Sequence, residues 1–295
     1  MRKYTLYIIL ALATALLGGQ KSMARTPMFN MSFHCENDTS KLTSLLKQGL
    51  DIKPATIGNL MVEYAKMLEG TPYKGGTLEV NDTEKLVINI DSVDCTTFVE
   101  SVAALTRCTL NRRYSWRDYA HFLQEVRYRQ GNLDGYASRL HYVSDWAIDN
   151  QHRGNLKEIT SDFKGVRNTV RTLNFMSRNR SLYPKLADDE PFERIKSVEI
   201  GYRNHKFSYI NSTGFTNKKF VEVARSGDII AMVTKENSLD VQHMAILYID
   251  QATNTPFIIH ASSKYGKVVL DKEDLSEYLR HNRSVAGIRV FRVTE

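Results

Sequence analysis

Cysteine is scarce in this sequence, which has three cysteines among its 295 residues. It contains no C-x-x-C pair and no His-x-x-x-His spacing, so a structural zinc site has little support. Internal repeats and low-complexity segments are also absent, which excludes a repeat architecture. The charged and apolar fractions are ordinary. We therefore expect a globular protein without a bound metal.

The one long apolar run, residues 4–17, lies at the N-terminus and is too short for a comfortable membrane span. Arg2 and Lys3 precede it, and small residues ending at Ala24 follow it, which is typical of a signal peptide. No cysteine follows closely enough for a lipoprotein anchor. We expect a signal peptide at residues 1–24, an exported, periplasmic mature protein without a membrane anchor, and a polar leader at residues 25–53.

Export makes the three cysteines informative, because an odd number in an oxidising compartment leaves at least one free thiol. If Cys35 and Cys108 form a disulfide, Cys95 is the free one, but the sequence does not establish that pairing. The net charge of +7 favours anionic partners, and a solvated basic surface is the alternative. We expect no nucleic-acid partner, and the oligomeric state stays open.

Apolar periodicity predicts helices followed by strands. The expected helices cover residues 54–69, with proline at the first helical position, about 92–108, and 115–129. Residues 131–201 are predicted to be an irregular insertion with one or two helices. Strands are expected at residues 228–234, 241–249, 256–262, 267–270 and 285–293, with a short helix near 274–279. This order predicts a single α+β domain over residues 54–295, with helices packed on a C-terminal antiparallel sheet.

Cys95 lies at the predicted start of the second helix, where backbone N–H groups and the helix dipole favour a thiolate. His243 and His260 lie within two predicted strands joined by a turn near residues 251–254. If Asp250 opposes Thr255, the two histidines are diagonal neighbours on one face of the hairpin. A register slip of one residue would separate them.

These residues could form a cysteine hydrolase site of the papain-like kind. Cys95 would be the nucleophile, His243 the general base and His260 the residue that orients it. The Cys95 backbone N–H would stabilise the oxyanion, with help from the Tyr73 hydroxyl. Such chemistry needs no cofactor. The alternatives are three ordinary core residues or a metal site.

Six segments together resemble the N-acetylmuramoyl-L-alanine amidase-like family, an amidase branch of the NlpC-type papain-like cell-wall hydrolases. They are residues 71–73 (TPY), 94–100 (DCTTFVE), 140–146 (LHYVSDW), 227–228 (GD), 242–245 (QHMA) and 259–262 (IHAS). The segment that begins at Asp94 and the one that ends at Trp146 are the specific ones. The resemblance spans nearly the whole mature chain.

The resemblance implies a catalytic Cys95–His243–His260 triad and cleavage of the amide between the muramic acid lactyl group and L-alanine. It also implies a preference for 1,6-anhydro-muropeptides as substrates. The common endopeptidases of the fold cut between D-glutamate and the diamino acid and carry Asp-Cys-Ser-Gly at the nucleophile. Residues 94–97 (DCTT) depart from that motif. Such an endopeptidase, a non-catalytic peptidoglycan-binding module and a metal-dependent amidase remain alternatives.

The resemblance also suggests substrate-binding residues. Beside Tyr73 and Asp94, the expected set in the central segment is Arg139, Tyr142, Ser144, Asp145 and Trp146. The alternative is that Tyr142 and Trp146, four residues apart, belong to the core. Five basic residues could meet stem-peptide carboxylates or form a solvated face. They are Lys164, Arg167, Arg171, Arg178 and Arg180.

Overall fold

The computed structural model of the protein describes residues 30–294, and the predicted signal peptide lies outside this range. Within it, no helix is long and apolar enough to cross a membrane. The helices are α1 (Asp38–Gln48), α2 (Ile57–Met67), α3 (Cys95–Leu110), α4 (Trp116–Arg127), α5 (Val143–His152), α6 (Phe175–Arg178), α7 (Asp189–Ile200), α8 (Asn217–Phe220) and α9 (Leu275–His281). The strands are β1 (Met31–Phe33), β2 (Leu86–Ile88), β3 (Leu156–Glu158), β4 (Val166–Arg171), β5 (His205–Asn211), β6 (Ile229–Thr234), β7 (Val241–Asp250), β8 (Thr255–Ser262), β9 (Lys267–Leu270) and β10 (Val285–Val293).

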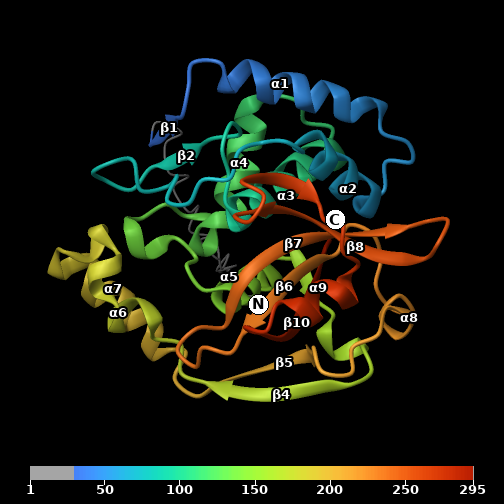
Figure 1. The fold of residues 1–295 in the computed structure, drawn as a ribbon. Coiled ribbons are helices and arrows are strands. Elements are labelled where there is room, and N and C mark those ends of the chain that lie inside the picture. The colour runs from blue at the N-terminus through green and yellow to red at the C-terminus, as the bar shows by residue number, and fades with distance from the viewer. Residues whose placement is uncertain (1–29, 295) are drawn as a thin grey trace, which may run out of the picture.

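The main sheet has the strand order β4-β5-β10-β6-β7-β8-β9, and β3 also pairs with β10. All of these pairings are antiparallel, whereas β1 and β2 form a separate parallel pair. Helices α1 to α4 lie together on one side of the central strands, and β4 and β5 lie at the opposite end of the molecule (Figure 1). The predicted α+β architecture with an antiparallel sheet is confirmed.

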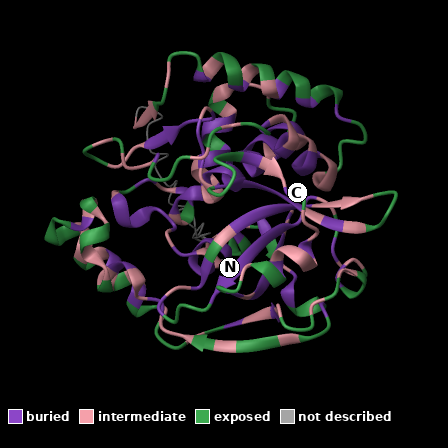
Figure 2. Ribbon diagram, in the orientation of Figure 1, coloured by how far each residue is buried: buried purple, intermediate pink, exposed green. Residues whose placement is uncertain are grey.

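The central strands are buried on both faces, whereas β4 is largely exposed (Figure 2). Alternate residues of β7 enter different cores, as strand geometry requires. Met244 and Ile246 pack with the residues of α2, α3 and α4, while Ala245 and Leu247 pack on the other face with Leu275 of α9. This two-sided burial fixes the register of the strands that carry the histidines.

Several helix boundaries differ from the expected ones for local reasons. Helix α2 begins at Ile57 because Thr56 caps it, and Pro54, expected at the first helical position, lies before the helix and follows a cis peptide bond. Gly70 ends this segment at a positive φ of 85°, a conformation that glycine adopts without steric cost. The helix near residues 274–279 is present as α9, with Asp274 as its N-cap.

Two segments are more ordered than the sequence predicts. The described part of the polar leader contains β1 and α1, and α1 buries Leu42 and Leu46 in the main core. Residues 131–201 contain α5, α6 and α7, and also β3 and β4, which pair with β10 and β5 of the main sheet. The central segment is therefore built into the sheet and contains more regular structure than expected.

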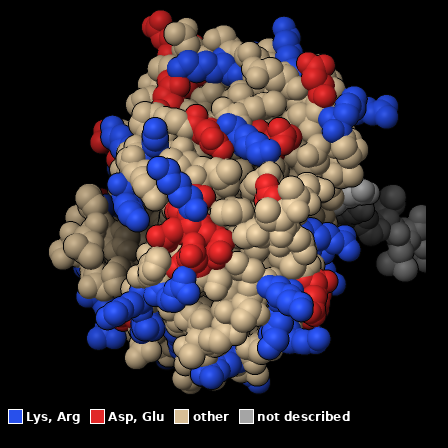
Figure 3. Space-filling view, turned by 45° about the vertical axis from the view of Figure 1, so that its right-hand side comes forward, with Lys and Arg blue, Asp and Glu red and all other residues tan. Residues whose placement is uncertain are grey.

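Charges of both signs share the surface. On the face shown in Figure 3, Lys and Arg side chains are interspersed with Asp and Glu side chains, and one acidic group lies among basic ones. The net charge of +7 is therefore not gathered into one basic surface on this face. A continuous basic surface is what binding to a polyanion would use.

Candidate active site

The first turn of α3 holds Cys95 in place through a capping box. Asp94 Oδ1 accepts the backbone N–H of Thr97 at 2.8 Å, and Thr97 Oγ1 accepts the backbone N–H of Asp94 at 2.9 Å. These bonds satisfy two backbone donors that an uncapped helix would leave unpaired. Asp94, expected to contact substrate, thus has a structural role as the N-cap beside the thiol.

The segment that contains Tyr73 lies beside this helix start. Tyr73 forms a parallel bridge with Val93, and its backbone N–H donates to the carbonyl of Gly266 at 2.9 Å. Burial, followed by the charges of Cys95 and Asp94, raises the pKa of Tyr73. The phenol is therefore protonated at neutral pH and able to donate a hydrogen bond near Cys95.

Strands β7 and β8 have the register that the sequence predicts. Asp250 pairs with Thr255, and the ladder continues to the pair Ile246–Ile259. His243 and His260 lie just beyond this last pair. Their rings meet there, with His243 Nε2 2.7 Å from His260 Nδ1. The hairpin therefore brings the two histidines together.

Asp271 is a third member of this group that the sequence reasoning missed. Its Oδ2 lies 3.2 Å from His260 Nε2, and both side chains are buried. Asp271 directly follows β9, so only the pairing of β8 with β9 brings it to His260. An aspartate one residue after a predicted strand was the available signal.

Cys95 is half-buried, and helix α3 packs on β7 and β8. Burial, followed by the negative charge of Asp94, raises the pKa of the Cys95 thiol to about 11, although the backbone N–H of Met244 opposes this rise. Within the described chain, no hydrogen bond joins Cys95 Sγ to His243. The resting sulfur is therefore a thiol, not the thiolate that the helix start alone would favour.

His243 is neutral at physiological pH. Burial, followed by the neighbouring His260, lowers the pKa of His243 to about 3, although Asp271 opposes this fall. A neutral imidazole has one unprotonated nitrogen, which a general base requires. His243 immediately precedes Met244, whose backbone N–H is next to the Cys95 sulfur. A base and a nucleophile thus lie on adjoining elements.

We expect the variant Asp94→Asn to react faster with iodoacetamide than the wild type below about pH 9. Asparagine is as good an N-cap as aspartate, so helix α3 is retained while the negative charge that raises the Cys95 pKa is lost. The measurement is the alkylation rate of Cys95 against pH, followed by mass spectrometry. An unchanged profile in a folded variant would show that Asp94 does not control the thiol.

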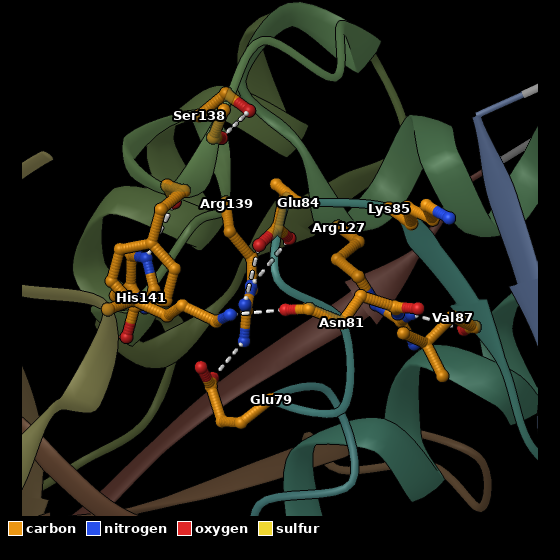
Figure 4. A network of polar contacts seen from close by, with 12 residues as sticks. Glu79, Asn81, Glu84, Lys85, Val87, Arg127, Ser138, Arg139 and His141 are labelled. Atoms are coloured by element: carbon orange, nitrogen blue, oxygen red, sulfur yellow. Dashed lines mark hydrogen bonds and ion pairs between the residues drawn. The ribbon is translucent and has the colours of Figure 1, made fainter.

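Arg139 is engaged with acidic residues of the protein itself. Its guanidinium pairs with Glu79 at 2.7 Å and with Glu84 at 2.8 Å (Figure 4). It also lies over the ring of Tyr136. Only 8% of Arg139 is exposed. Arg139 therefore ties the central segment to the loop before β2, and its charge is already neutralised. This differs from the substrate contact expected from the sequence.

The other four expected binding residues are buried. Tyr142, Ser144 and Asp145 have side-chain hydrogen-bond partners inside the protein, whereas Trp146 Nε1 has none within the described residues. Asp145 accepts two hydrogen bonds from Arg129 and one from Tyr202. Ser144 accepts a hydrogen bond from Arg289 at 2.7 Å. None of Tyr142, Ser144, Asp145 and Trp146 is more than 2% exposed. This burial corresponds to the core alternative, and a role of these residues in substrate recognition stays a prediction.

We expect Tyr142→Phe to lower the free energy of unfolding by about 1–3 kcal/mol. The hydroxyl donates to Glu199 at 2.7 Å and accepts the backbone N–H of Met176 at 3.0 Å, so its loss leaves buried polar groups unpaired. Urea unfolding measures the change. Tyr209→Phe is the control, since its hydroxyl forms no hydrogen bond within residues 30–294. A raised KM at unchanged stability would instead support substrate binding by Tyr142.

The basic residues of the central segment are mostly occupied. Lys164 pairs with Glu222, Arg180 pairs with Asp189, and Arg171 donates to the carbonyls of Glu236 and Leu239. Arg167 and Arg178 are exposed. This pattern corresponds to the solvated-face alternative.

All three cysteines are free, so the pairing considered for Cys35 and Cys108 does not form. The donor atoms of Cys35, Asp38 and Asp91 lie within 4.8 Å of one another, close enough for a metal ion. Lys41 already forms an ion pair with Asp91, which supplies a positive charge there. In the described part of the chain, Cys95, His243 and His260 do not form such a cluster.

Comparisons with known proteins place this geometry in a family. The profile of the N-acetylmuramoyl-L-alanine amidase-like family matches residues 63–288. A crystal structure of an N-acetylmuramoyl-L-alanine amidase from Bacteroides uniformis is 35% identical, covers 81% of this chain and 99% of its own, and superposes with a TM-score of 0.75. No curated protein matches the chain.

Two further crystal structures are similar. A Bacteroides fragilis protein described as a candidate xylanase is 38% identical over 78% of this chain and 99% of its own, with a TM-score of 0.72. A Legionella pneumophila protein shares the fold at 22% identity, with a TM-score of 0.66 over 87% of this chain and 95% of its own. The profile match and the identity to the amidase establish what the sequence motifs suggested: the chain belongs to the N-acetylmuramoyl-L-alanine amidase-like family.

Proposed function

We propose that the protein is a cysteine-dependent N-acetylmuramoyl-L-alanine amidase with a papain-like arrangement of nucleophile and base. Its substrate would be peptidoglycan fragments in the periplasm, with a preference for 1,6-anhydro-muropeptides. The observation that carries the proposal is the histidine pair at 2.7 Å beside the helix start that holds Cys95. The family and its named amidase relative support the substrate class.

The protonation states suggest the order of events. Because the pKa of Cys95 is raised and that of His243 is lowered, the resting pair is neutral. His243 would remove the thiol proton as the sulfur attacks the lactyl carbonyl, and would then protonate the leaving amine of L-alanine. Water would hydrolyse the thioester to a free lactyl carboxylate. The Cys95 backbone N–H and the Tyr73 hydroxyl are the candidate oxyanion donors.

The description of one relative as a candidate xylanase raises a second possibility, glycoside hydrolysis. That reaction normally needs an acid and a base or nucleophile from two carboxyl groups that flank the sugar bond. The carboxylates beside Cys95 and His260 are those of Asp94 and Asp271. Both already form hydrogen bonds inside the protein: Asp94 caps helix α3, and Asp271 bonds to His260. The site therefore favours amide chemistry.

A defined anhydro-muropeptide, incubated with the chain lacking residues 1–24 and examined by mass spectrometry, tests the proposal. We expect the intact stem peptide beginning with L-alanine and a peptide-free anhydro-disaccharide. Cleavage after D-glutamate would instead indicate an endopeptidase. Unchanged substrate would leave the binding module as the better interpretation. The same muropeptide with a reducing sugar end tests the anhydro preference.

A further inference from the structure

A chain of three side chains extends from the proposed base into the protein: His243 is half-buried, and His260 and Asp271 are buried. His243 Nε2 lies 2.7 Å from His260 Nδ1, and His260 Nε2 lies 3.2 Å from Asp271 Oδ2. Asp271 is itself held firmly, because its backbone N–H donates to the carbonyl of Ile258 at 2.9 Å and its Oδ1 accepts the backbone N–H of Glu273 at 3.0 Å. Asp271 is 5% exposed and His260 is 2% exposed. A buried carboxylate in this position can control the protons of its neighbours.

The donor and acceptor properties of the three groups determine where the protons lie. Burial tends to raise the pKa of Asp271, but the hydrogen bond with His260 and the backbone N–H of Glu273 outweigh it, and the pKa is lowered. An ionised carboxylate only accepts hydrogen bonds, so His260 Nε2 carries a proton. With the His260 proton on Nε2, its Nδ1 is the acceptor in the bond to His243, and His243 Nε2 is the donor. The unprotonated nitrogen of neutral His243 is consequently Nδ1.

We propose that Asp271 is a positioning residue that selects the tautomer of His260 and, through it, of His243, and so leaves Nδ1 of His243 free to take the Cys95 proton. This inference rests on the proposed cysteine mechanism. When Nδ1 accepts that proton, His243 becomes an imidazolium whose Nε2–H still donates to His260. The same proton later passes from Nδ1 to the leaving amine, so the bonds to His260 and Asp271 keep their protons throughout.

The groups around the chain do not compete with Asp271 for His260. Tyr278 of α9 lies edge-on to the His260 ring, with 5.7 Å between the ring centroids, and its raised pKa keeps it uncharged. The charge of Lys264, in the turn between β8 and β9, acts on Asp271, and Cys95 on α3 is close enough to Tyr278 to influence its pKa. Glu273 pairs with His281 instead. Asp271 is therefore the carboxylate bonded to His260 in the described structure.

Nitrogen-15 NMR of the imidazole groups tests the proton positions without any substrate. In the wild-type chain we expect both His243 and His260 to carry the proton on Nε2, assigned with His243→Gln and His260→Gln. In Asp271→Asn the amide group can donate to His260 Nε2, which would reverse both tautomers and place a proton on His243 Nδ1. A wild-type His260 protonated on Nδ1 would overturn the proposal, whether or not the variant folds.

Kinetics provide the second readout. We expect Asp271→Asn to lower kcat for anhydro-muropeptide hydrolysis by about 10- to 100-fold, with a smaller change in KM and an altered acid limb of the kcat/KM profile. Asp271→Glu, which keeps the acceptor, should recover part of the loss. Glu273→Gln is the matched control and should keep wild-type tautomers and a rate within about twofold of the wild type.

The outcomes separate this inference from the proposed function. A folded Asp271→Asn variant with wild-type tautomers and a wild-type pH profile would overturn the role of Asp271 while the amidase activity stands. A wild type that cleaves no muropeptide would overturn the proposed function. In that case, the NMR spectra and the pH dependence of Cys95 alkylation would still decide whether Asp271 sets the state of His243.

Discussion

Replacing the nucleophile should abolish the reaction: we expect Cys95→Ala to lower the rate of muramoyl-L-alanine cleavage by at least about 10³-fold. In the proposed mechanism, Cys95 forms the covalent thioester, and His243 acts only by moving the proton of this thiol. No other thiol can substitute, since Cys108 is buried and Cys35 donates its S–H to Asp91 at 3.1 Å. Product formation from a defined anhydro-muropeptide, followed over hours, measures the loss.

Cys35→Ala is the matched control, because it also removes a thiol but leaves α3 and the two strands untouched. Its rate should stay within about threefold of the wild type. If Cys95→Ala kept most of the activity, and a chelator removed it, a metal-dependent amidase would replace the cysteine mechanism. If neither variant nor wild type showed activity, but the wild type bound muropeptides, the binding-module alternative would gain support.

The second large effect concerns stability. We expect Arg127→Met to lower the free energy of unfolding by about 3–5 kcal/mol, because it leaves the carboxylate of Glu100 buried and unpaired. Arg127 Nε donates to Glu100 Oε2 at 2.7 Å, and a second guanidinium nitrogen donates to the carbonyl of Val87 at 2.8 Å. Both charged side chains are 3% exposed. This pair joins α3, which carries Cys95, to α4 and β2.

The loss of stability in the Arg127→Met variant should depend on pH. Burial raises the pKa of Glu100, and the attraction of Arg127 opposes that rise in the wild type. Without Arg127 the folded state binds a proton at Glu100 more readily than the unfolded chain does, so stability falls as the pH rises above the unfolded pKa of about 4.3. Urea unfolding at pH 5 and at pH 8 should therefore show the larger deficit at the higher pH.

Arg113→Met is the matched control. Arg113 pairs with Asp118 at 3.2 Å, but its side chain is 60% exposed, so the change should cost less than about 1 kcal/mol. The double variant Arg127→Met with Glu100→Leu should recover much of the loss, since no buried charge remains. A single Arg127→Met variant as stable as the wild type would mean that water or another group compensates Glu100.

Patterns local in the chain predicted much of the fold. The alternation of apolar residues located β6 to β10, and the hairpin turn between β7 and β8 set a register that the structure keeps, so the meeting of His243 and His260 followed from local rules. The strands of the polar leader and of the central segment were harder to predict, because β1 is short, β4 has exposed residues, and neither has much apolar periodicity. Such strands form because a partner strand is present, which a pattern along the chain does not report.

A related reason applies to the binding residues expected in the central segment. Tyr142 and Asp145 are residue types that often bind ligands. Here, however, Tyr142 forms a hydrogen bond with Glu199, far away in the chain, and Asp145 forms one with Arg129 on another element. Whether a polar side chain meets solvent or a buried partner depends on long-range packing. The sequence suggested both a substrate-binding role and a core role for these residues, but it could not choose between these two roles.

The sequence by itself determined the family, the α+β order of elements and the positions of Cys95, His243 and His260, because each of these follows from contiguous motifs or from local periodicity. Only the tertiary structure decided that Asp271 reaches His260 and that Cys95 rests as a thiol with its pKa raised to about 11. These last features depend on burial and on charges brought together from separate elements. A one-dimensional pattern contains neither the dielectric environment of a side chain nor its long-range neighbours.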